Sequence, residues 1–234
     1  MKAVILAGGL GMRLRPFTEA IPKPLLPIGE KAILEIQIEN LKRHGFDEIF
    51  LATNYKSDYI ENFFGDGHRY GVKLRHSKET EPLGTAGPLT LLTEELVEPF
   101  LVMNGDILSS IDFRKFYDFA LQKDTLLALA IKKVKMPFAF GNIFFEGDYV
   151  TDIEEKPDLE TFALAGIYVM KPEIFDLIPT QEYYNMDQLI KKLLGANTPV
   201  AKYEMTEYWL DIGRIDDYEA AQKAFDGKEF SESD

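Results

Sequence analysis

The stretch MKAVILAGGLGMRLRPFTEAIPKPLLPI, residues 1–28, places a glycine-rich turn directly after a short apolar segment. The apolar segment Ala3–Ala7 predicts a buried strand. Gly8, Gly9 and Gly11 then allow backbone amides to approach phosphate oxygens closely, because no Cβ intervenes. A strand that runs into such a turn is typical of an α/β protein that binds an anion beyond its sheet.

Two familiar phosphate-binding motifs do not match this turn. A P-loop needs Lys followed by Ser or Thr after its second glycine, where this chain has Met12 and Arg13, and the dinucleotide fingerprint needs a glycine where this chain has Leu14. The turn alone therefore fits either a phosphate site or a plain tight turn. Two cations favour the phosphate site. Arg13 can hold a triphosphate with both prongs of its guanidinium, and the prolines on either side of Lys23 fix the backbone that aims its ammonium.

The charge of the chain is unevenly distributed. Residues 1–31 carry a net charge of +3, whereas the whole chain carries −13 and the remainder therefore −16. A small basic site in an acidic protein favours a compact anionic ligand, with a chance cluster on a solvated face as the alternative. Because a nucleic-acid-binding protein would normally present a basic surface, we expect no nucleic-acid partner.

Length and composition indicate one α/β domain, or one domain with a small subdomain. The chain has 234 residues, of which 46% are hydrophobic, and no apolar run approaches the ~18 residues that a membrane span needs, so we expect no membrane partner. There is no cysteine, which excludes disulfides and thiolate chemistry, and the three histidines lack zinc-ligand spacing. Met1 leads directly into the apolar segment without a charged signal-peptide region, so we expect a cytoplasmic protein.

The first half of the chain predicts alternating strands and helices. Strands are expected at residues 3–7, 48–53, 72–76 and 99–103, and helices at 34–44 and 59–64, with a further helix capped by Thr85 and running through Leu92. This order predicts a mostly parallel sheet whose ligands lie beyond the carboxyl ends of the strands.

The second half predicts antiparallel additions to that sheet. Strand-like segments occur at residues 126–132, 141–145, 150–155 and 164–170, and we interpret them as the acceptor side of the site. A helix at 187–194, a short strand at 208–212 and a closing helix at 215–225 follow, before a polar tail at 226–234 that we expect to fray.

Several short motifs, taken together and in this order, resemble the sugar-1-phosphate nucleotidyltransferases, also called nucleotide-sugar pyrophosphorylases. The motifs are GGLGMRLRPFT (8–18), PKPLLPI (22–28), EPLGTAGPL (81–89), NGD (104–106), EEKP (154–157), AGIYVM (165–170) and EYWLDIGRIDDY (207–218). The resemblance covers nearly the whole chain. It implies a Rossmann-like nucleotidyltransferase fold in a single domain over residues 1–225, with an NTP-binding half at about 1–110 and a sugar-phosphate-binding half at about 111–225. It also implies one reaction, in which a sugar-1-phosphate oxygen attacks the α-phosphorus of an NTP and pyrophosphate leaves.

The resemblance also assigns roles to individual residues. Arg13 would bind the β- and γ-phosphates, Lys23 would contact the α-phosphate, and Asp106 and Asp211 would hold Mg²⁺. The wider nucleotide-binding set would be Leu6, Ala7, Gly8, Gly9, Gly11, Met12, Arg13, Lys23, Glu79, Glu81, Gly84 and Thr85. The sugar phosphate would be bound by Gly141, Glu155, Lys156, Ala165 and Gly166. From the residues alone, Asp106 could instead cap a turn and Lys156 could be surface charge, whereas Asp211 lies in an apolar strand and needs a partner or a metal.

The chain departs from the family pattern at informative positions. Met12 replaces the usual hydroxyl residue before the arginine, and Ala165 replaces an asparagine that often contacts the sugar. In KETEPLGTAG (78–87), Glu79 stands where thymidylyl relatives have glutamine, with Glu81 two residues on. A carboxylate only accepts hydrogen bonds and matches the adjacent N1–H and N2–H₂ of guanine, so GTP is favoured over UTP or dTTP. The alternatives are a uridylyltransferase with an acidic residue in this loop and a Glu79 that is simply solvated.

The segment KETEPLGTAG (78–87) also resembles the mannose-1-phosphate guanylyltransferases, which carry a similar PLGTAG loop. Some family members have a C-terminal β-helix, but we expect none after Phe225 in this chain. The sugar stays open among mannose, a heptose and an amino sugar, and the oligomeric state stays open with a homodimer among the options. A catalytically silent sugar-nucleotide-sensing subunit is the alternative class. The presence of Arg13, Lys23, Asp106, Lys156 and Asp211 together favours the enzyme.

Overall fold

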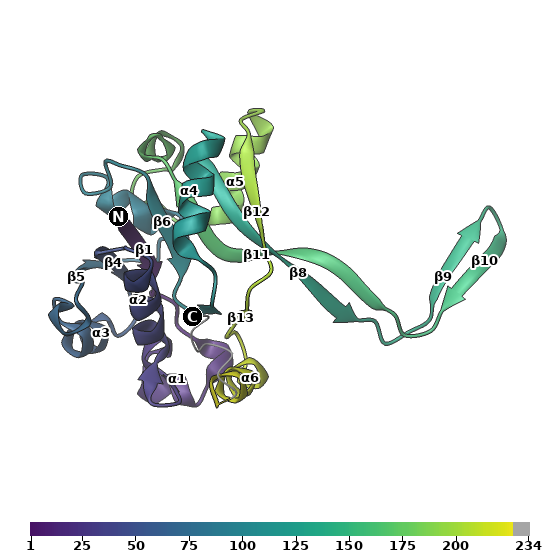
Figure 1. Ribbon diagram of the computed structural model, residues 1–234, viewed down its shortest axis with the longest axis horizontal. Helices are drawn as coiled ribbons and strands as arrows, with labels where there is room; N and C mark the ends of the chain where they lie inside the picture. Colours follow the sequence, from purple (N-terminus) through teal and green to yellow (C-terminus); the bar gives the residue numbers. More distant parts are fainter. Residues whose placement is uncertain (227–234) are drawn as a thin grey trace.

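A seven-stranded sheet forms the centre of the computed structural model, which describes residues 1–226 (Figure 1). Its strand order is β12-β8-β11-β6-β1-β4-β5. The bounds are β1 (Lys2–Leu6), β4 (Glu48–Thr53), β5 (Lys73–Lys78), β6 (Phe100–Asn104), β8 (Leu127–Pro137), β11 (Asp158–Met170) and β12 (Val200–Met205). Neighbouring strands pair in parallel, except that β11 runs antiparallel to both β6 and β8. The predicted α/β class, with a mostly parallel sheet and antiparallel additions, is confirmed.

Both faces of the sheet are buried, because alternate side chains of each strand point to opposite sides. Ala3 and Ile5 of β1 pack in one cluster with α2 (Ile33–Arg43), α3 (Ser57–Phe64) and α4 (Phe113–Lys123). Val4 packs in the opposite cluster with the short 3₁₀ helices η4 (Gly87–Leu92) and η5 (Pro172–Leu177) and with α5 (Met186–Gly195). The strands are therefore fixed from both sides, and their carboxyl ends form a rigid edge.

A third apolar cluster attaches the C-terminal segment to the glycine-rich turn. It joins Leu14, Ile28, Leu108, Ile212 and Ala221, all of which are fully buried. These residues come from five segments: η1 (Met12–Leu14), β2 (Pro27–Ile28), β7 (Ile107–Ser109), the residue after β13 (Trp209–Asp211), and α6 (Ile215–Asp226). Strand β2 pairs with β3 (Lys31–Ala32), and β13 pairs with β7. The shorter elements are α1 (Phe17–Ala20), η2 (Lys23–Leu25) and η3 (His68–Tyr70).

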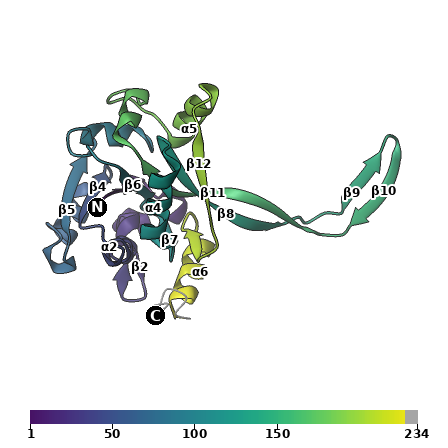
Figure 2. The same ribbon diagram turned by 45° about the horizontal axis from the view of Figure 1, so that its top comes forward.

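A long two-stranded arm projects from the body (Figures 1 and 2). Strands β8 and β11 continue well beyond the predicted segments 126–132 and 164–170, and they carry a smaller hairpin of β9 (Asn142–Glu146) and β10 (Tyr149–Glu154) at their far end. We call residues 133–163 the arm.

Three other features differ from the sequence-based expectations. The helix expected under a Thr85 cap is wrong: η4 begins after Ala86 without a side-chain cap, and Thr85 Oγ1 instead accepts a hydrogen bond of 2.8 Å from the backbone N–H of Met186. Helix α4 and strand β12 were not expected at all. Asp226, the first residue of the predicted tail, ends α6, and residues 227–234 lie outside the described residues.

Within the part of the chain that the structure describes, no helix is long and apolar enough to cross a membrane.

Candidate active site

The glycine-rich turn leaves the carboxyl end of β1 in a conformation that its sequence requires. Gly11 has a φ of 61°, and a Cβ built there would lie 2.8 Å from Cγ2 of Thr18. Thr18 Oγ1 donates a hydrogen bond of 2.9 Å to the carbonyl oxygen of Gly11. Any larger residue at position 11 would therefore face both backbone strain and a clash, so this glycine is needed for the shape of the turn.

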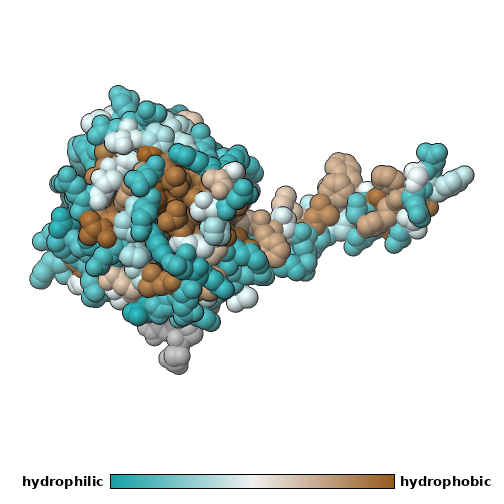
Figure 3. All heavy atoms as spheres, turned by 90° about the horizontal axis from the view of Figure 1, so that it is seen from above, coloured by the Kyte–Doolittle hydropathy of each residue, from teal (hydrophilic) through white to brown (hydrophobic). Residues whose placement is uncertain are grey.

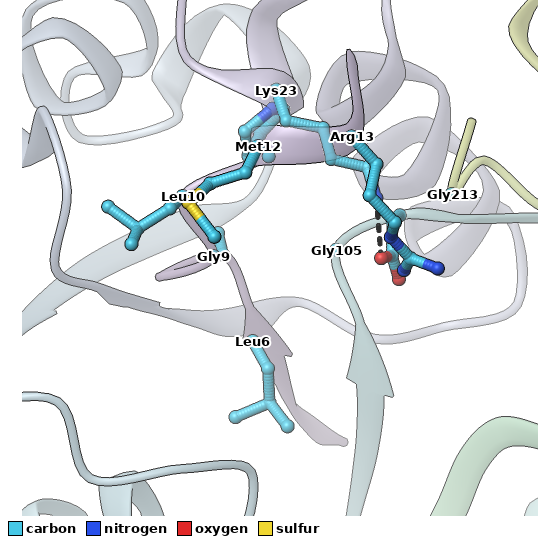
Figure 4. A pocket seen from close by; sticks show the side chains of 12 residues that line it. Leu6, Gly9, Leu10, Met12, Arg13, Lys23, Gly105 and Gly213 are labelled. Atoms are coloured by element: carbon cyan, nitrogen blue, oxygen red, sulfur yellow. Dashed lines mark hydrogen bonds and ion pairs between the residues drawn. The ribbon is translucent and has the colours of Figure 1, made fainter. Parts of the chain in front are cut away.

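Arg13 extends from this turn toward the C-terminal segment. A Cβ built on Gly213 would lie 3.3 Å from Nη2 of Arg13, which places the guanidinium directly against Gly213 (Figure 4). The exposed side chains of Leu10 and Met12 point to the other side of the turn. The turn thus separates a cationic side from an apolar one.

Lys23 and Asp106 form an ion pair inside the same cavity. The Nζ atom of Lys23 lies 2.6 Å from Oδ2 of Asp106, and Lys23 is only 8% exposed. Lys23 begins η2, and Asp106 follows Gly105 immediately beyond the carboxyl end of β6. A buried ammonium needs a compensating anion, and the carboxylate of Asp106 supplies it.

Asp211 lies beside Asp106 through a backbone ladder. In this ladder Asp211 of β13 is opposite Ile107 of β7, and the N–H of Ile212 donates a hydrogen bond of 2.9 Å to the carbonyl oxygen of Asp106. The residue as a whole is exposed, and protein atoms cover only part of its carboxylate. This loss of hydration raises the pKa of Asp211, and the negative charge of Asp106 raises it further, while Lys23 and Arg13 oppose the rise. The four predicted catalytic side chains are therefore close enough to interact electrostatically.

The pair of carboxylates fits Mg²⁺, which takes oxygen ligands and is commonly held by one or two carboxylates together with substrate phosphates. The carboxylates of Asp106 and Asp211 repel one another, because the charge of Asp106 adds to the effect of burial in raising the pKa of Asp211. A divalent cation bound by both carboxylates would offset this repulsion. Among residues 1–226 there is no group of three or more His, Cys, Asp or Glu side chains that could hold a metal ion. The protein thus offers two ligands, and phosphate oxygens would have to complete the shell.

Two adjoining cavities surround this constellation. The first, of about 410 Å³, is lined by the glycine-rich turn together with Arg13, Lys23, Asp106 and Gly213. The second, of about 360 Å³, shares Leu6, Gly9, Leu10 and Asp106 with the first. It continues toward Glu79, Gly84 and Thr85. Together the cavities form a path from a cationic end to an end lined by amides and a carboxylate. Asp211 is beside this path but does not line either cavity.

Glu79 and Glu81 lie in different surroundings. Glu79 is 7% exposed and lines the second cavity, whereas Glu81 is exposed and lines neither cavity. Oε2 of Glu79 accepts a hydrogen bond of 2.9 Å from the N–H of Leu83. Burial raises the pKa of Glu79, and the hydrogen bond from Leu83 opposes that rise in part. Of the two predicted base-reading carboxylates, the structure places only Glu79 where it can meet a bound base.

The predicted sugar-phosphate residues divide into two groups. Ala165 and Gly166 lie at the body: the carbonyl oxygen of Ala165 accepts a hydrogen bond of 2.8 Å from Nε1 of Trp209, and a Cβ on Gly166 would lie 2.7 Å from Nδ2 of Asn104. Asn104 itself lines the second cavity. Gly141, Glu155 and Lys156, in contrast, lie on the arm, and none of them lines either cavity. Within a single chain, the structure does not bring these three residues to Arg13 and Asp106.

Sequence reasoning missed several polar residues that line the second cavity, namely Asn54, Asn104, Tyr183 and Asn185. Asn54 and Asn104 had a readable signal, because each is a polar residue at the carboxyl end of a buried parallel strand. Tyr183 and Asn185 had no such signal, since they enter the cavity from the irregular segment before α5.

Comparison with known proteins gives one consistent result. A sequence profile of the family described as nucleotidyl transferase matches residues 2–227. Mannose-1-phosphate guanylyltransferase 1 from Arabidopsis thaliana is 36% identical over 227 residues, which are 93% of this chain and 63% of the relative. UTP–glucose-1-phosphate uridylyltransferase from Synechocystis is 33% identical over 238 residues, with 93% of this chain and 61% of the relative covered. The chain thus spans less than two thirds of the length of these curated relatives.

Among solved structures, HddC from Yersinia pseudotuberculosis complexed with GMP-PN resembles the chain with a TM-score of 0.74 and 29% identity. The match covers 96% of this chain and 99% of HddC.

Proposed function

The chain belongs to the nucleotidyl transferase family, and we propose that it converts an NTP and a sugar 1-phosphate into an NDP-sugar and pyrophosphate. The observation that carries this proposal is the convergence of Arg13, Lys23, Asp106 and Asp211 beside one cavity at the carboxyl edge of the sheet. Arg13 and Lys23 come from the short helices η1 and η2, while Asp106 follows β6 and Asp211 ends β13, so only the folded chain assembles the set. A triphosphate is the ligand class that such alternating cations and carboxylates suit.

The proposed reaction is an in-line displacement at phosphorus. An oxygen of the sugar phosphate forms a bond to the α-phosphorus, the bond from that phosphorus to the bridging oxygen of the β-phosphate breaks, and pyrophosphate leaves with the electron pair. No proton has to be transferred in this step, so positioning and charge neutralisation supply the catalysis.

Each cation has a separate part in that step. Lys23 is held by Asp106 at the floor of the cavity and would face the α-phosphate, where negative charge crowds as the nucleophile approaches. Arg13 is exposed at the other side of the cavity and would hold the β- and γ-phosphates bidentately, which stabilises them as they leave. The glycine-rich turn between them presents its backbone amides to the same phosphates.

Asp106 and Asp211 would hold Mg²⁺ in this proposal. When bound, the ion supplies positive charge that offsets the triphosphate and orients its oxygens. The contribution of the chain is to keep the two carboxylates side by side through the pairing of β7 with β13, which does not depend on the ligand.

We favour GTP as the nucleotide. Oε2 of Glu79 retains one lone pair beside its bond to Leu83, and Oε1 carries none of the described hydrogen bonds, so the carboxylate can accept the N1–H and N2–H₂ of guanine. The Arabidopsis relative is named for a guanylyl transfer, and HddC was solved with GMP-PN. The Synechocystis relative is named for UTP, so uridylyl transfer is the leading alternative, with thymidylyl transfer behind it.

The acceptor is a sugar 1-phosphate of the mannose, heptose or amino-sugar type. Mannose 1-phosphate has the support of the Arabidopsis relative's name. In the proposal, residues 1–110 bind mainly the nucleotide, residues 111–225 bind mainly the sugar phosphate, and the enzyme acts in the cytoplasm, where both substrates occur. A sensing subunit without catalysis has no observation in its favour, since no member of the cationic and carboxylate set is missing.

Product formation tests this function. GTP, UTP, dTTP and ATP are each incubated with Mg²⁺ and each of mannose, glucose, heptose and glucosamine 1-phosphates, and pyrophosphate release and the NDP-sugar are measured by mass spectrometry. We expect one GTP pair to dominate and release to require both substrates. Binding of an NDP-sugar without turnover of any pair would support the sensing subunit instead.

A further inference from the structure

The arm is a continuation of two strands of the central sheet. Strands β8 and β11 pair without interruption from Lys133 opposite Phe162 to Pro137 opposite Asp158. The body ends at Lys132, where β12 makes its last pair and Nζ donates hydrogen bonds of 2.7 and 2.6 Å to the carbonyl oxygens of Thr206 and Glu207. At about 3.3 Å per residue, the ribbon carries Phe138 roughly 20 Å beyond this anchor.

Residues expected to bind the sugar phosphate lie at the end of this ribbon. The N–H of Phe138 donates a hydrogen bond of 2.9 Å to the carbonyl oxygen of Pro157, so the neighbouring Lys156 is also roughly 20 Å out. Gly141 and Glu155 face one another there, because a Cβ on Gly141 would lie 3.2 Å from Oε2 of Glu155. Both views in Figures 1 and 2 show the hairpin of β9 and β10 away from the body.

The arm also carries many of the exposed apolar side chains. Half of the large hydrophobic side chains that are exposed among residues 1–226 lie between residues 136 and 164. Phe145 is 73% exposed and Tyr149 is 80% exposed, and Figure 3 shows apolar patches along the projecting arm. An isolated two-stranded hairpin is marginally stable in water and needs a further strand or a packing surface. The arm therefore offers an apolar surface that a partner could cover.

We propose that this partner is a second copy of the chain, and that two copies exchange arms so that Lys156 and Glu155 of each copy complete the cavity of the other. The proposal rests on the proposed function, because it uses the sugar-phosphate role of these two residues. A single chain has the nucleotide half of the site at its body, together with Ala165 and Gly166, whereas Gly141, Glu155 and Lys156 are out of reach on its arm. A two-fold exchange brings both halves together twice and covers both apolar arms, which an unrelated partner would not do.

Folding the arm back onto its own cavity is the competing arrangement. It would have to break or sharply bend the ladder of β8 and β11, whose single irregularity lies at the body between Leu164 and Tyr168. The exchange of arms keeps that ladder intact. This difference favours the partner copy over closure within one chain.

Engineered cysteines test the arrangement without using activity, since the chain has no cysteine of its own. In the double variant Met12→Cys, Lys156→Cys, one thiol lies at the cavity and the other on the arm. A short bifunctional thiol reagent should join two chains in the double variant, as seen on a reducing denaturing gel. A control with Met12→Cys and Lys191→Cys, on the exposed face of α5, should not be joined efficiently. A cross-link within one chain would show that the arm folds back onto its own cavity. The absence of any cross-link would show that no arm, from either copy, reaches the cavity. Either outcome overturns the proposal.

Mass in solution and complementation add two independent readouts. Light scattering should give twice the chain mass of 26.7 kDa. Phe145→Glu should weaken association at least about tenfold. Val97→Glu, which changes an apolar residue on the body that is 65% exposed, should not. A monomeric wild type overturns the proposal.

For complementation, inactive Arg13→Ala and Lys156→Ala chains are unfolded together and refolded. Random pairing should recover about a quarter of wild-type activity, because half of the dimers are mixed and each has one intact site of two. Activity that stays absent overturns the exchange, provided that the wild type is active. A wild type that turns over no substrate pair but still cross-links between chains would instead refute the proposed function and leave the exchange of arms standing.

Discussion

The Nζ atom of Lys23 lies 2.6 Å from Oδ2 of Asp106, across 83 positions of sequence. This contact joins the proline-flanked segment after the glycine-rich turn to the end of β6, and it fixes both residues in one cavity. Asp211 reaches the same place through the pairing of β13 with β7. The site is therefore assembled from three remote segments whose positions are set by the sheet and by the apolar cluster beneath them.

Arg13→Lys should lower turnover about 100-fold although it keeps the positive charge. A lysine is a point charge and cannot reproduce the two-pronged grip on the leaving phosphates. Steady-state kinetics with GTP should show the loss mainly in kcat. Arg15→Lys is the matched control, since Arg15 is exposed and its nearest carboxylate is that of Glu19 at 3.9 Å. A pure KM effect would show that Arg13 binds only the ground state.

Asp211→Asn should reduce turnover by about 100-fold or more at saturating Mg²⁺, because it removes one of the two carboxylates next to the phosphate cavity. The metal concentration needed for half activity should rise as well. Asp216→Asn, in the first turn of α6, is the control and should change neither quantity. Near-normal activity of Asp211→Asn would exclude Asp211 as a metal ligand.

Glu79→Gln should become more stable relative to the wild type as the pH rises. The pKa of Glu79 is raised by burial in the folded chain, so between about 4.5 and this higher value the folded state holds more protons than the unfolded state. The free energy of unfolding of the wild type therefore loses this contribution as the pH rises through that window, and Gln does not titrate.

Urea denaturation of the wild type, Glu79→Gln and Glu81→Gln between pH 4 and pH 7 measures this difference. Glu81→Gln should follow the wild type, because Glu81 is exposed. A gap between Glu79→Gln and the wild type that does not change with pH would contradict the burial of an ionising carboxyl at position 79.

Nucleotide choice should depend on the same residue. If Glu79 accepts hydrogen bonds from guanine, the wild type should prefer GTP over ITP, which lacks the N2 amino group. The free-energy difference between the two nucleotides should equal the contribution of one hydrogen bond to a charged group. That is about 1.5–3 kcal/mol, or about ten- to a hundredfold in kcat/KM. Glu79→Gln should narrow the gap, because an amide can turn a donor toward other bases. Equal use of GTP and ITP, or a clear preference for UTP, would remove the guanine assignment and leave the transferase reaction in place.

Sequence alone predicted those features that depend on short motifs at the ends of strands. The glycine-rich turn, Lys23 between its prolines and the acidic NGD and WLD segments all end up at one site, because each follows or borders a strand of the sheet. Helix α4 was missed despite a readable signal: Asp112 accepts a hydrogen bond of 2.9 Å from the N–H of Lys115, and apolar residues recur with helical spacing after it.

The arm could not have been predicted from pattern. Phe144, Phe145 and Val150 indicate strands in the same way whether a hairpin lies against the body or projects from it. Alternation sets which side chains share a face of a strand but not what covers that face. Thr85 is the opposite case: its hydroxyl suggested a cap for the helix that follows it, but it stabilises the start of α5, about 100 residues later.

The reaction itself is tested most directly by following phosphorus from labelled GTP. With a reactive sugar 1-phosphate and Mg²⁺, label in the α-position should appear in the NDP-sugar, and label in the γ-position should appear only in pyrophosphate. Both transfers should be absent without the sugar phosphate. The proposed reaction is contradicted if label from the γ-position enters the sugar product, or if the α-labelled nucleotide is released without joining the sugar. In either case the chain does not perform the displacement that we assign to Arg13, Lys23 and the two aspartates.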